Sequence, residues 1–389
     1  MGKYMIRKNL VFASACMGML LFGIVFLSLG TVSTFIQEKF GLDKLAVASL
    51  ASSLPLGMLM GSLLFGPMVD RFGYKPLMLI STGFILLALE MIAFSGSVWM
   101  FRVSYFLIGL GGGAINGGTN ALVADLASES KGAKLSLLGV FFGIGALGMP
   151  LITGSLIHVM PYNTIIGLIG GIVLVPLLFI VFVRFPEPKY QQGFPVHQAL
   201  ALLKEPILLV MGFILFFESA LEGITGNWTT SYLKGISLSD QAAIFALSAE
   251  VITIGTTRLL LSRLLRTVRP RIILYTCFFL LITGSVTLYL ANSFAGAVAA
   301  MIIIGAGSAA GFPVILGYVG ELFADLSGTA FGIAMVIALV GNTLVNYLVG
   351  WISASSGIRH FPFILLFCAM MMLVLFSMVL KMVSHKIKT

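Results

Sequence analysis

Long apolar segments recur along the whole chain, and they constrain its fold more than any other feature. Of the 389 residues, 59% are hydrophobic and 10% are charged, whereas a soluble domain carries about 25% charged residues. A continuous apolar stretch of about 20 residues crosses a bilayer as a helix. The sequence therefore predicts an all-α membrane protein with twelve spans, near residues 10–33, 45–67, 76–95, 100–125, 134–158, 162–184, 206–234, 241–265, 271–291, 295–323, 330–354 and 361–382.

The basic residues are distributed unevenly between the two sides of the predicted membrane. With the N-terminus inside, 18 of the 23 Lys and Arg residues fall in cytoplasmic segments and 5 on the other side. Cytoplasmic loops normally carry this excess. The net charge of +9 is therefore attributed to topology, and no nucleic-acid partner is expected. We expect a multi-pass protein of a bacterial inner membrane, with a first span that is retained and both termini in the cytoplasm.

Signatures of enzymes and metalloproteins are missing from the sequence. Cys16, Cys277 and Cys368 all fall inside apolar spans, where they are interpreted as small buried hydrophobes. The His residues are scattered without the spacing of zinc ligands. No P-loop and no catalytic Ser, His and Asp set emerges. We therefore expect neither enzymatic activity, nor catalytic residues, nor a metal site, nor an organic cofactor.

The chain divides into two related halves. A polar, proline-punctuated stretch at 185–205 is interpreted as a cytoplasmic linker between domains at 1–184 and 206–389. A shift of 196 residues aligns six positions of the halves: Gly109 with Gly305, Gly111 with Gly307, Asp125 with Glu321, Gly132 with Gly328, Gly145 with Gly341, and Gly154 with Gly350. Two parallel repeats related by an axis along the membrane normal are a known layout of transporters.

One short segment identifies a family. The run from Gly61 to Lys75 ends an apolar span in Asp70-Arg71-Phe-Gly73-Tyr-Lys75. It resembles the loop between helices 2 and 3 of the major facilitator superfamily. The resemblance implies twelve helices in two pseudo-symmetric six-helix bundles, the major facilitator fold, which transports by alternating access. Glycines in such a segment let backbones approach closely, and its charged groups can form ion pairs with neighbouring helix ends, as a gate requires.

Two further stretches narrow the resemblance. Gly111–Asp125, with Asn116 and Asn120, and the Glu222–Tyr232 segment resemble the fucose–galactose–glucose:proton symporters and their sodium-dependent glucose transporter-like relatives. Proton-coupled members of that branch carry a Glu where this chain has Asn116, and tend to carry an acid in helix 1. Residues 10–36 contain no acid. Proton coupling through the first half is therefore in doubt.

Acids inside the spans are functional candidates, because an ionisable group near mid-bilayer is costly. Glu218 and Glu222 lie four residues apart on one helical face, and Glu250 lies at a similar depth in the next span. We assign these three to coupling with an ion, either a proton or sodium. The alternative is that an acid only bonds a neighbouring helix.

The remaining polar residues suggest a solute site and a gate. Hydroxyl-rich solutes need amide and carboxylate partners and an aromatic face, which predicts a substrate site at Asn116, Asn120, Glu222, Trp228, Tyr232, Asn342 and Asn346. Interhelical amide bonds are the alternative role for the Asn residues. The predicted gate comprises Asp70, Arg71, Lys75, Asp125, Arg258 and Glu321.

The sequence thus predicts a monomeric secondary active transporter of a small polar solute, best fitted by a sugar, with proton or sodium coupling. Three alternatives stay open. The chain is an exporter of drugs or metabolites, a sugar uniporter, or a membrane receptor that transports nothing. The 196-residue repeat and the acids inside the spans argue against the receptor.

Overall fold

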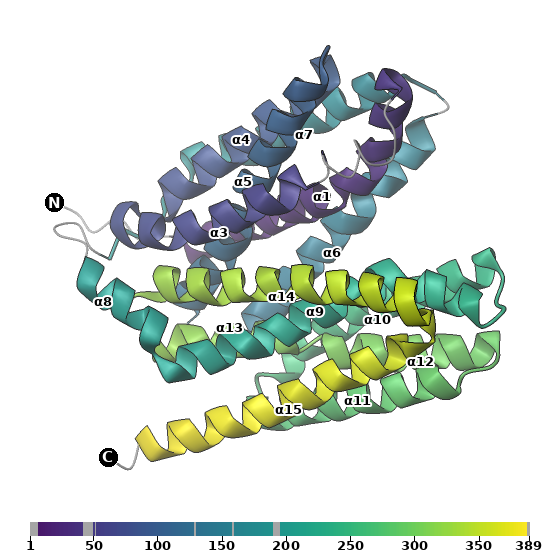
Figure 1. Ribbon diagram of the computed structural model, residues 1–389. Coiled ribbons are helices and arrows are strands. Elements are labelled where there is room, and N and C mark those ends of the chain that lie inside the picture. Colours follow the sequence, from purple (N-terminus) through teal and green to yellow (C-terminus); the bar gives the residue numbers. More distant parts are fainter. Residues whose placement is uncertain are drawn as a thin grey trace, which may run out of the picture. The chain divides into compact units, whose positions relative to one another are not determined.

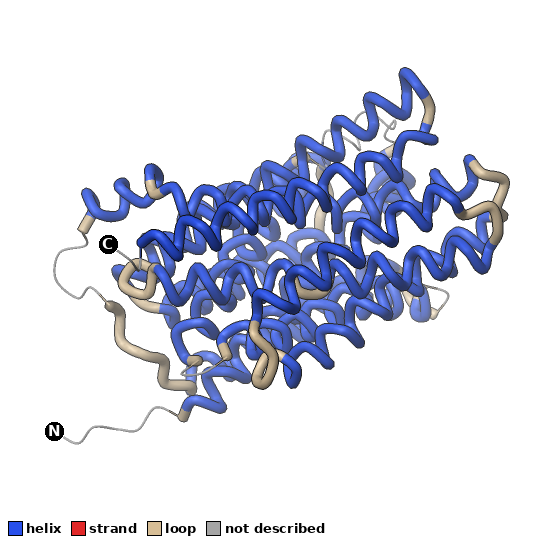
Figure 2. Tube along the Cα trace, turned by 90° about the horizontal axis from the view of Figure 1, so that it is seen from below, coloured by secondary structure: helices blue, strands red, loops and turns tan. Residues whose placement is uncertain are grey.

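The structure is a computed structural model that describes residues 7–41, 50, 52–127, 130–157, 159–189 and 195–386. Its described part consists of helices and connecting loops, with no strand (Figure 2). Twelve helical segments are long and apolar enough to cross a membrane, as the sequence predicts.

The first half contributes six of these spans (Figure 1). Helices α3, α4, α5 and α7 pack side by side, and α1 packs against α5. The helices are α1 (Lys8–Phe40), α3 (Ser53–Phe72), α4 (Tyr74–Phe94), α5 (Val98–Leu126), α6 (Lys131–Leu156) and α7 (Tyr162–Phe182).

The second half contributes the other six spans after two short helices in the linker, α8 (Val196–Ala201) and η1 (Leu202–Lys204). Residues 190–194 of the predicted linker lie outside the described residues. The helices are α9 (Pro206–Gly235), α10 (Asp240–Leu264), α11 (Pro270–Leu290), α12 (Phe294–Ser308), α13 (Gly311–Leu322), α14 (Ser327–Ser356) and, after η2 (Ile358–His360), α15 (Phe361–Lys386).

Local sequence sets several helix ends. Gly73, with a φ of +83°, makes the turn between α3 and α4, a conformation that side chains rarely tolerate. Ser239 and Ser293 cap α10 and α12 by accepting from the backbone N–H groups of Ala242 and Gly296 at 3.2 Å each. These connections turn the chain sharply at the ends of the spans.

Small residues allow the helices of the first half to touch. A Cβ atom added at Gly109 or Gly113 of α5 would collide with the carbonyl oxygens of Leu54 and Met58 in α3. Gly57 and Gly61 of α3 approach the α5 backbone in the same way. In a membrane, where lipid tails are as apolar as Leu, close backbone packing of this kind drives helix association.

The same packing confirms the register of the repeat. Gly145 lies against the carbonyl of Leu20, and Gly341 against that of Phe216. Each residue of the second contact lies 196 positions after its counterpart in the first. Likewise Gly109 packs on α3 and Gly305 on α10, while Gly111 packs on α4 and Gly307 on α11. Glycines at equivalent positions therefore make equivalent helix-packing contacts in the two halves.

The chain forms two compact units whose composition differs from the predicted halves at two places. The first unit comprises residues 1–126, 138–199 and 323–332, and the second comprises 127–137, 200–322 and 333–389. The two exchanged segments, 127–137 and 323–332, are related by the 196-residue repeat to within one residue. The start of α6 thus packs within the second unit, and the start of α14 within the first.

The tenth span differs from the continuous helix predicted at 295–323. It is interrupted at Ala309 and Ala310, which separate α12 from α13. Gly311, the first residue after the break, lies against the carboxyl of Glu218. The interruption of the tenth span therefore lies beside Glu218, one of the candidate acids.

Candidate functional site

Helices α9 and α10 of the second unit bring a base and the three predicted acids together. Arg258 Nη2 lies 2.8 Å from Glu222 Oε1, in a hydrogen-bonded ion pair. The arginine side chain is 8% exposed and that of Glu222 is 27% exposed. Arg258, predicted as a gate residue, therefore has an internal partner in the candidate ion site.

Glu218 lies one turn before Glu222 and is fully buried. Neither of its carboxyl oxygens has a hydrogen-bond partner among the residues that the structure describes. A Cβ atom at Gly311 would collide with this carboxyl, so the glycine at the α12–α13 break makes room for it. A buried polar group without a partner is expensive, so Glu218 stays a candidate for a functional role.

Glu250 is also buried, with 2% exposure, and its carboxyl contacts the hydroxyl of Thr225. Its Oε2 has no partner in the described part of the chain. Gly305 of α12 packs against the backbone of Glu250 and so fixes the distance between α10 and α12. Glu218, Glu222, Glu250 and Arg258 are therefore ionisable groups that lie away from the ends of α9 and α10.

A ladder of amides joins α9 to α14 in the same unit. Asn227 Nδ2 and Trp228 Nε1 both donate to Asn346 Oδ1, at 2.9 and 3.2 Å. Asn346 donates in turn to Asn342 Oδ1 at 3.0 Å, and Asn342 donates to the Ser219 carbonyl at 2.9 Å. Asn342, Asn346 and Trp228 are half-buried. The predicted Asn pair thus makes interhelical bonds and still retains an exposed face.

Tyr232, a predicted substrate residue, is not part of this amide ladder. It is 3% exposed, its ring packs on Phe361, and its hydroxyl donates to the Leu288 carbonyl at 3.3 Å. Because its polar atom is already bonded within the protein, Tyr232 acts as a packing residue in this structure.

In the first unit, the predicted amides Asn116 and Asn120 form a pair within α5. Asn120 Nδ2 donates to the carbonyl of Asn116 at 2.8 Å and to its Oδ1 at 3.1 Å. On α1, Phe22 and Phe26 pack on Phe142 of α6. These phenylalanines occupy the positions that the repeat equates with Glu218 and Glu222. The first unit is therefore apolar where the second is charged.

The predicted gate residue Asp70 caps a helix of the first unit. Its carboxylate accepts from the backbone N–H groups of Gly328 and Thr329 at 3.2 and 2.8 Å and from the Thr329 hydroxyl at 2.7 Å. These groups form the start of α14, where unsatisfied N–H groups and the helix dipole favour a negative charge. Gly66 allows the approach, because a Cβ there would meet the backbone of Gly328 at 2.6 Å.

Other gate residues contact helix ends as well. Lys75 Nζ donates to the Val181 carbonyl near the end of α7 at 2.7 Å. Asp125 accepts from the Tyr74 hydroxyl at 2.6 Å and pairs with Lys189 of the linker at 2.9 Å. Arg71 is exposed, with its guanidinium over the ring of Phe72.

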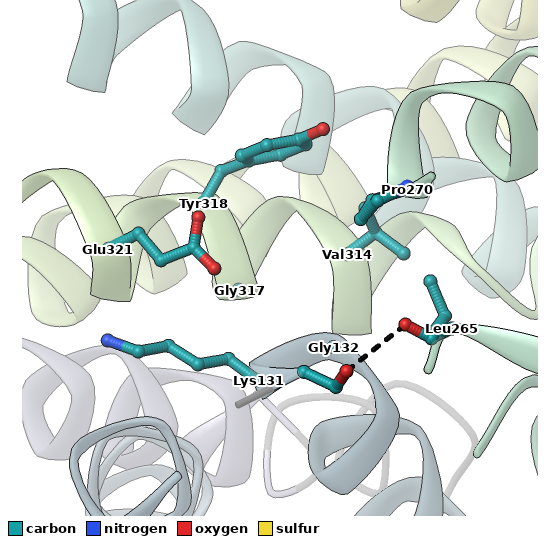
Figure 3. Close-up of a pocket in the computed structure, with 9 residues that line it drawn as sticks. Lys131, Gly132, Leu265, Pro270, Val314, Gly317, Tyr318 and Glu321 are labelled. Carbon is teal, nitrogen blue, oxygen red and sulfur yellow. Dashed lines mark hydrogen bonds between the residues drawn. The ribbon is translucent and has the colours of Figure 1, made fainter. Parts of the chain in front are cut away.

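Glu321, the repeat partner of Asp125, lines a small pocket in the second unit (Figure 3). Lys131 and Tyr318 line the same pocket. Lys131 Nζ bonds the Gly320 carbonyl at 2.7 Å, and Ser130 Oγ donates to the Leu265 carbonyl at 3.2 Å. The start of α6 is thus attached to the second unit mainly through backbone carbonyls.

Sequence reasoning missed three residues that complete these contacts. Lys189 donates to the Ala324 carbonyl and the Ser327 hydroxyl at 2.6 and 2.5 Å, beyond its pair with Asp125. Ser136 Oγ donates to the Arg258 carbonyl at 2.8 Å. Asn227 belongs to the amide ladder. Each of these contacts joins residues far apart in the sequence, and no local pattern predicts such a contact.

Known structures share this fold. The solved structure of FucP in the outward conformation matches with a TM-score of 0.78 and 18% identity, covering 95% of this chain and 98% of that one. A second match is the proton:xylose symporter XylE, with a TM-score of 0.78, 16% identity and coverage of 96% and 95%.

Sequence comparison agrees with the structural one. The glucose/mannose transporter GlcP of Bacillus subtilis is 23% identical over 342 residues, which cover 85% of this chain and 84% of GlcP. The family model described as Major Facilitator Superfamily matches residues 11–342. The predicted family and fold are therefore confirmed: the chain is a multi-pass membrane protein that belongs to the major facilitator superfamily, a family of transporters rather than enzymes.

Proposed function

We propose that this transporter moves a sugar-sized polyol by alternating access, and that an ion bound by the acids of α9 and α10 drives the movement. The observation that carries the proposal is the amide ladder of exposed Asn227 and half-buried Asn346 and Asn342 beside Trp228. Amides donate to and accept from hydroxyl groups, and an indole offers a face for a sugar ring.

Two further observations support a sugar. Glu222 lies less than two helical turns before Trp228 on α9 and keeps part of its carboxylate exposed, so it can accept a hydroxyl hydrogen while paired with Arg258. GlcP, which resembles this chain over most of its length, is described as a transporter of glucose and mannose. Asn116 and Asn120 of α5 stay predicted substrate residues.

Topology is part of the proposal. The excess of Lys and Arg in one set of loops supports cytoplasmic termini, and the Bacillus subtilis relative supports a bacterial cytoplasmic membrane. A monomer is sufficient, because one chain contains both repeats.

The first test is a ligand panel scored by thermal stabilisation of the purified protein. D-glucose, D-mannose, D-xylose and L-fucose are compared with large apolar cations. A ligand at 100 times its Kd stabilises the folded state by about 2.7 kcal/mol. Stabilisation by a monosaccharide supports the proposal, whereas stabilisation by the cations alone indicates an exporter.

The second test is transport in proteoliposomes with proton and sodium gradients imposed separately. We expect Glu222→Gln to abolish accumulation against a concentration gradient and to retain most of the counterflow at saturating sugar, because exchange does not require ion release and Gln keeps an oxygen that accepts from a hydroxyl. Wild-type uptake that ignores both gradients means a uniporter, and the acids of α9 and α10 are then not coupling residues.

A further inference from the structure

Glu218 differs from the other acids that bond within the protein. Asp70, Asp125 and Glu222 each have a base, an N–H group or a hydroxyl at their carboxylates. Glu218 is fully buried, and neither of its oxygens has a partner in the described part of the chain. The proposed function gives Glu218 only a general place among the ion-coupling acids, so its own role requires an explanation.

The charged and titratable groups around Glu218 leave no free positive charge for it. Its electrostatic neighbours are Glu222 on its own helix, Arg258 on α10 and Cys277 on α11, and Glu250 lies beyond Glu222. Residues 294–317 of α12 and α13 and residues 333–346 of α14 contain no titratable side chain, and residues 361–380 of α15 contain only Cys368. Arg258 is already neutralised by Glu222. An ionised Glu218 would be an unpaired buried charge, which is strongly unfavourable.

We propose that Glu218 binds the coupling ion as a proton, that it is the neutral acid in this structure, and that Arg258 releases the proton by exchanging Glu222 for Glu218. This inference rests on the proposed function, because it identifies the ion of the same site. It assigns coupling to a helix of the second unit, whereas α1 carries phenylalanines at the equivalent positions.

The geometry suits such an exchange. Glu218 and Glu222 lie one turn apart on the same face of α9, a separation of about 6 Å along the axis. Arg258 contacts Glu222 through Nη2, while its buried Nε has no partner among the described residues. A guanidinium presents five donors on a long side chain, so it can shift by one turn without moving its backbone.

The proton balance of the step is simple. The Glu218 carboxylic acid breaks its O–H bond and gives H⁺ to water, leaving a carboxylate that pairs with the guanidinium of Arg258. Arg258 keeps its charge throughout. Glu222 is left as a carboxylate, which its partial exposure allows water or a solute hydroxyl to solvate. Reloading reverses the step, with Arg258 returning to Glu222 as Glu218 takes up a proton.

The surroundings of Glu218 favour a proton over sodium. Hard metal cations require several oxygen ligands around them. Neither carboxyl oxygen of Glu218 has a hydrogen-bond partner among the described residues, and Gly311 leaves little room beside the carboxyl. A proton needs only the carboxyl oxygen.

Infrared spectroscopy of the full chain in lipid nanodiscs tests the proposal without any sugar. A protonated carboxyl has a C=O band separate from those of carboxylates and amides. In sodium-free buffer at neutral pH, the wild type should show this band, Glu218→Gln should remove one component, and Glu321→Gln should leave it unchanged. Glu250→Gln identifies any component from Glu250. A band that Glu218→Gln leaves intact, or that sodium chloride abolishes, overturns the assignment.

A separate variant tests whether Arg258 exchanges Glu222 for Glu218. Glu222→Gln frees Arg258 to pair with Glu218, so the Glu218 component should disappear although the residue is still present. An unchanged band in Glu222→Gln refutes the exchange. If that variant does not fold, loss of the Glu218 component on alkaline titration of the wild type still tests proton binding by Glu218, and persistence of the component overturns it.

Transport separates this inference from the proposed function. Glu218→Gln should lose accumulation driven by a proton gradient and retain counterflow of D-glucose or D-mannose. If the wild type transports no sugar, the proposed function fails while the infrared result stands. If Glu218→Gln still accumulates sugar, the proton site lies elsewhere.

Discussion

Replacing Asp70 by Asn should weaken the attachment of α14 to the first unit by an amount that the structure allows us to estimate. The Asp70 carboxylate accepts three hydrogen bonds, two of them on Oδ2 from Thr329 and one on Oδ1 from the Gly328 N–H. An Asn has a single acceptor oxygen. If that oxygen keeps the two bonds to Thr329, the NH₂ group faces the Gly328 N–H, and two donors cannot bond each other.

The loss is therefore one charge-assisted hydrogen bond and the favourable interaction of a negative charge with the start of α14. Hydrogen bonds to charged groups contribute about 1.5–3 kcal/mol, and a charge at a helix end contributes about 0.3–1 kcal/mol. Since Asp70 regains water when the contact opens, we take about 2 kcal/mol as the net effect. That corresponds to about a 30-fold shift toward the open contact.

Hydrogen exchange measured by mass spectrometry reports this equilibrium directly. Backbone amides at 327–333 should exchange about 30-fold faster in Asp70→Asn than in the wild type, because exchange there requires the contact to open. A cysteine at Ser62, which is buried under Gly332 in the wild type, should also become accessible to a water-soluble thiol reagent.

Two controls bracket the result. Asp240→Asn removes an exposed charge whose partner is Lys234, and it should leave exchange at 327–333 unchanged. Thr329→Ala removes one neutral donor and keeps the charge of Asp70, so its effect should be smaller, about 1 kcal/mol. An acceleration below about threefold in Asp70→Asn, or equal effects of Asp70→Asn and Asp240→Asn, refutes the reasoning.

Three other perturbations have defined outcomes. Lys189→Met removes a partly exposed ion pair with Asp125 together with the hydrogen bonds to the Ala324 carbonyl and the Ser327 hydroxyl, and should open the same contact by about 1 kcal/mol, or about fivefold in exchange at 327–333; an effect as large as that of Asp70→Asn contradicts this ranking. Gly109→Ala should lower the thermal stability of the purified protein by about 1–3 kcal/mol, because its Cβ meets the Leu54 carbonyl. Gly143→Ala, with open space around it, should be neutral, and equal effects of the two refute the packing argument. Trp228→Ala should weaken monosaccharide binding about tenfold by calorimetry, whereas Trp351→Ala on the exposed face of α14 should not change it; equal losses indicate that Trp228 has no contact with solute.

The sequence was informative wherever membrane physics dominates. Apolar length alone placed the spans, and the register of 196 residues predicted which glycines do the same packing work. The interruption at Ala309–Ala310 was missed although Pro313 signals it, because a proline has no N–H for the carbonyl four residues earlier, that of Ala309, and its ring clashes with that carbonyl. The contact of Gly311 with the Glu218 carboxyl is long-range and has no local pattern.

The candidate site shows the same division. The acids were identified because an ionisable residue in an apolar span stands out. Their partners were not, because pairing depends on which helix faces lie opposite each other. Arg258 was assigned to the gate from its position near the end of α10, yet its long side chain extends to Glu222. Tyr232 matched the spacing of a sugar-binding motif but is bonded to Leu288.

The exchanged segments have a consequence for biosynthesis. Ser130, Lys131 and Ser136 bond to carbonyls that lie 135, 189 and 122 residues later in the chain. At synthesis rates of about 5–20 residues per second, the start of α6 waits roughly 6–40 s for its partners to leave the ribosome. During that time its polar groups depend on water or on the insertion machinery. A first half made alone never receives those partners, and it should be a target for membrane proteases rather than a stable half-transporter.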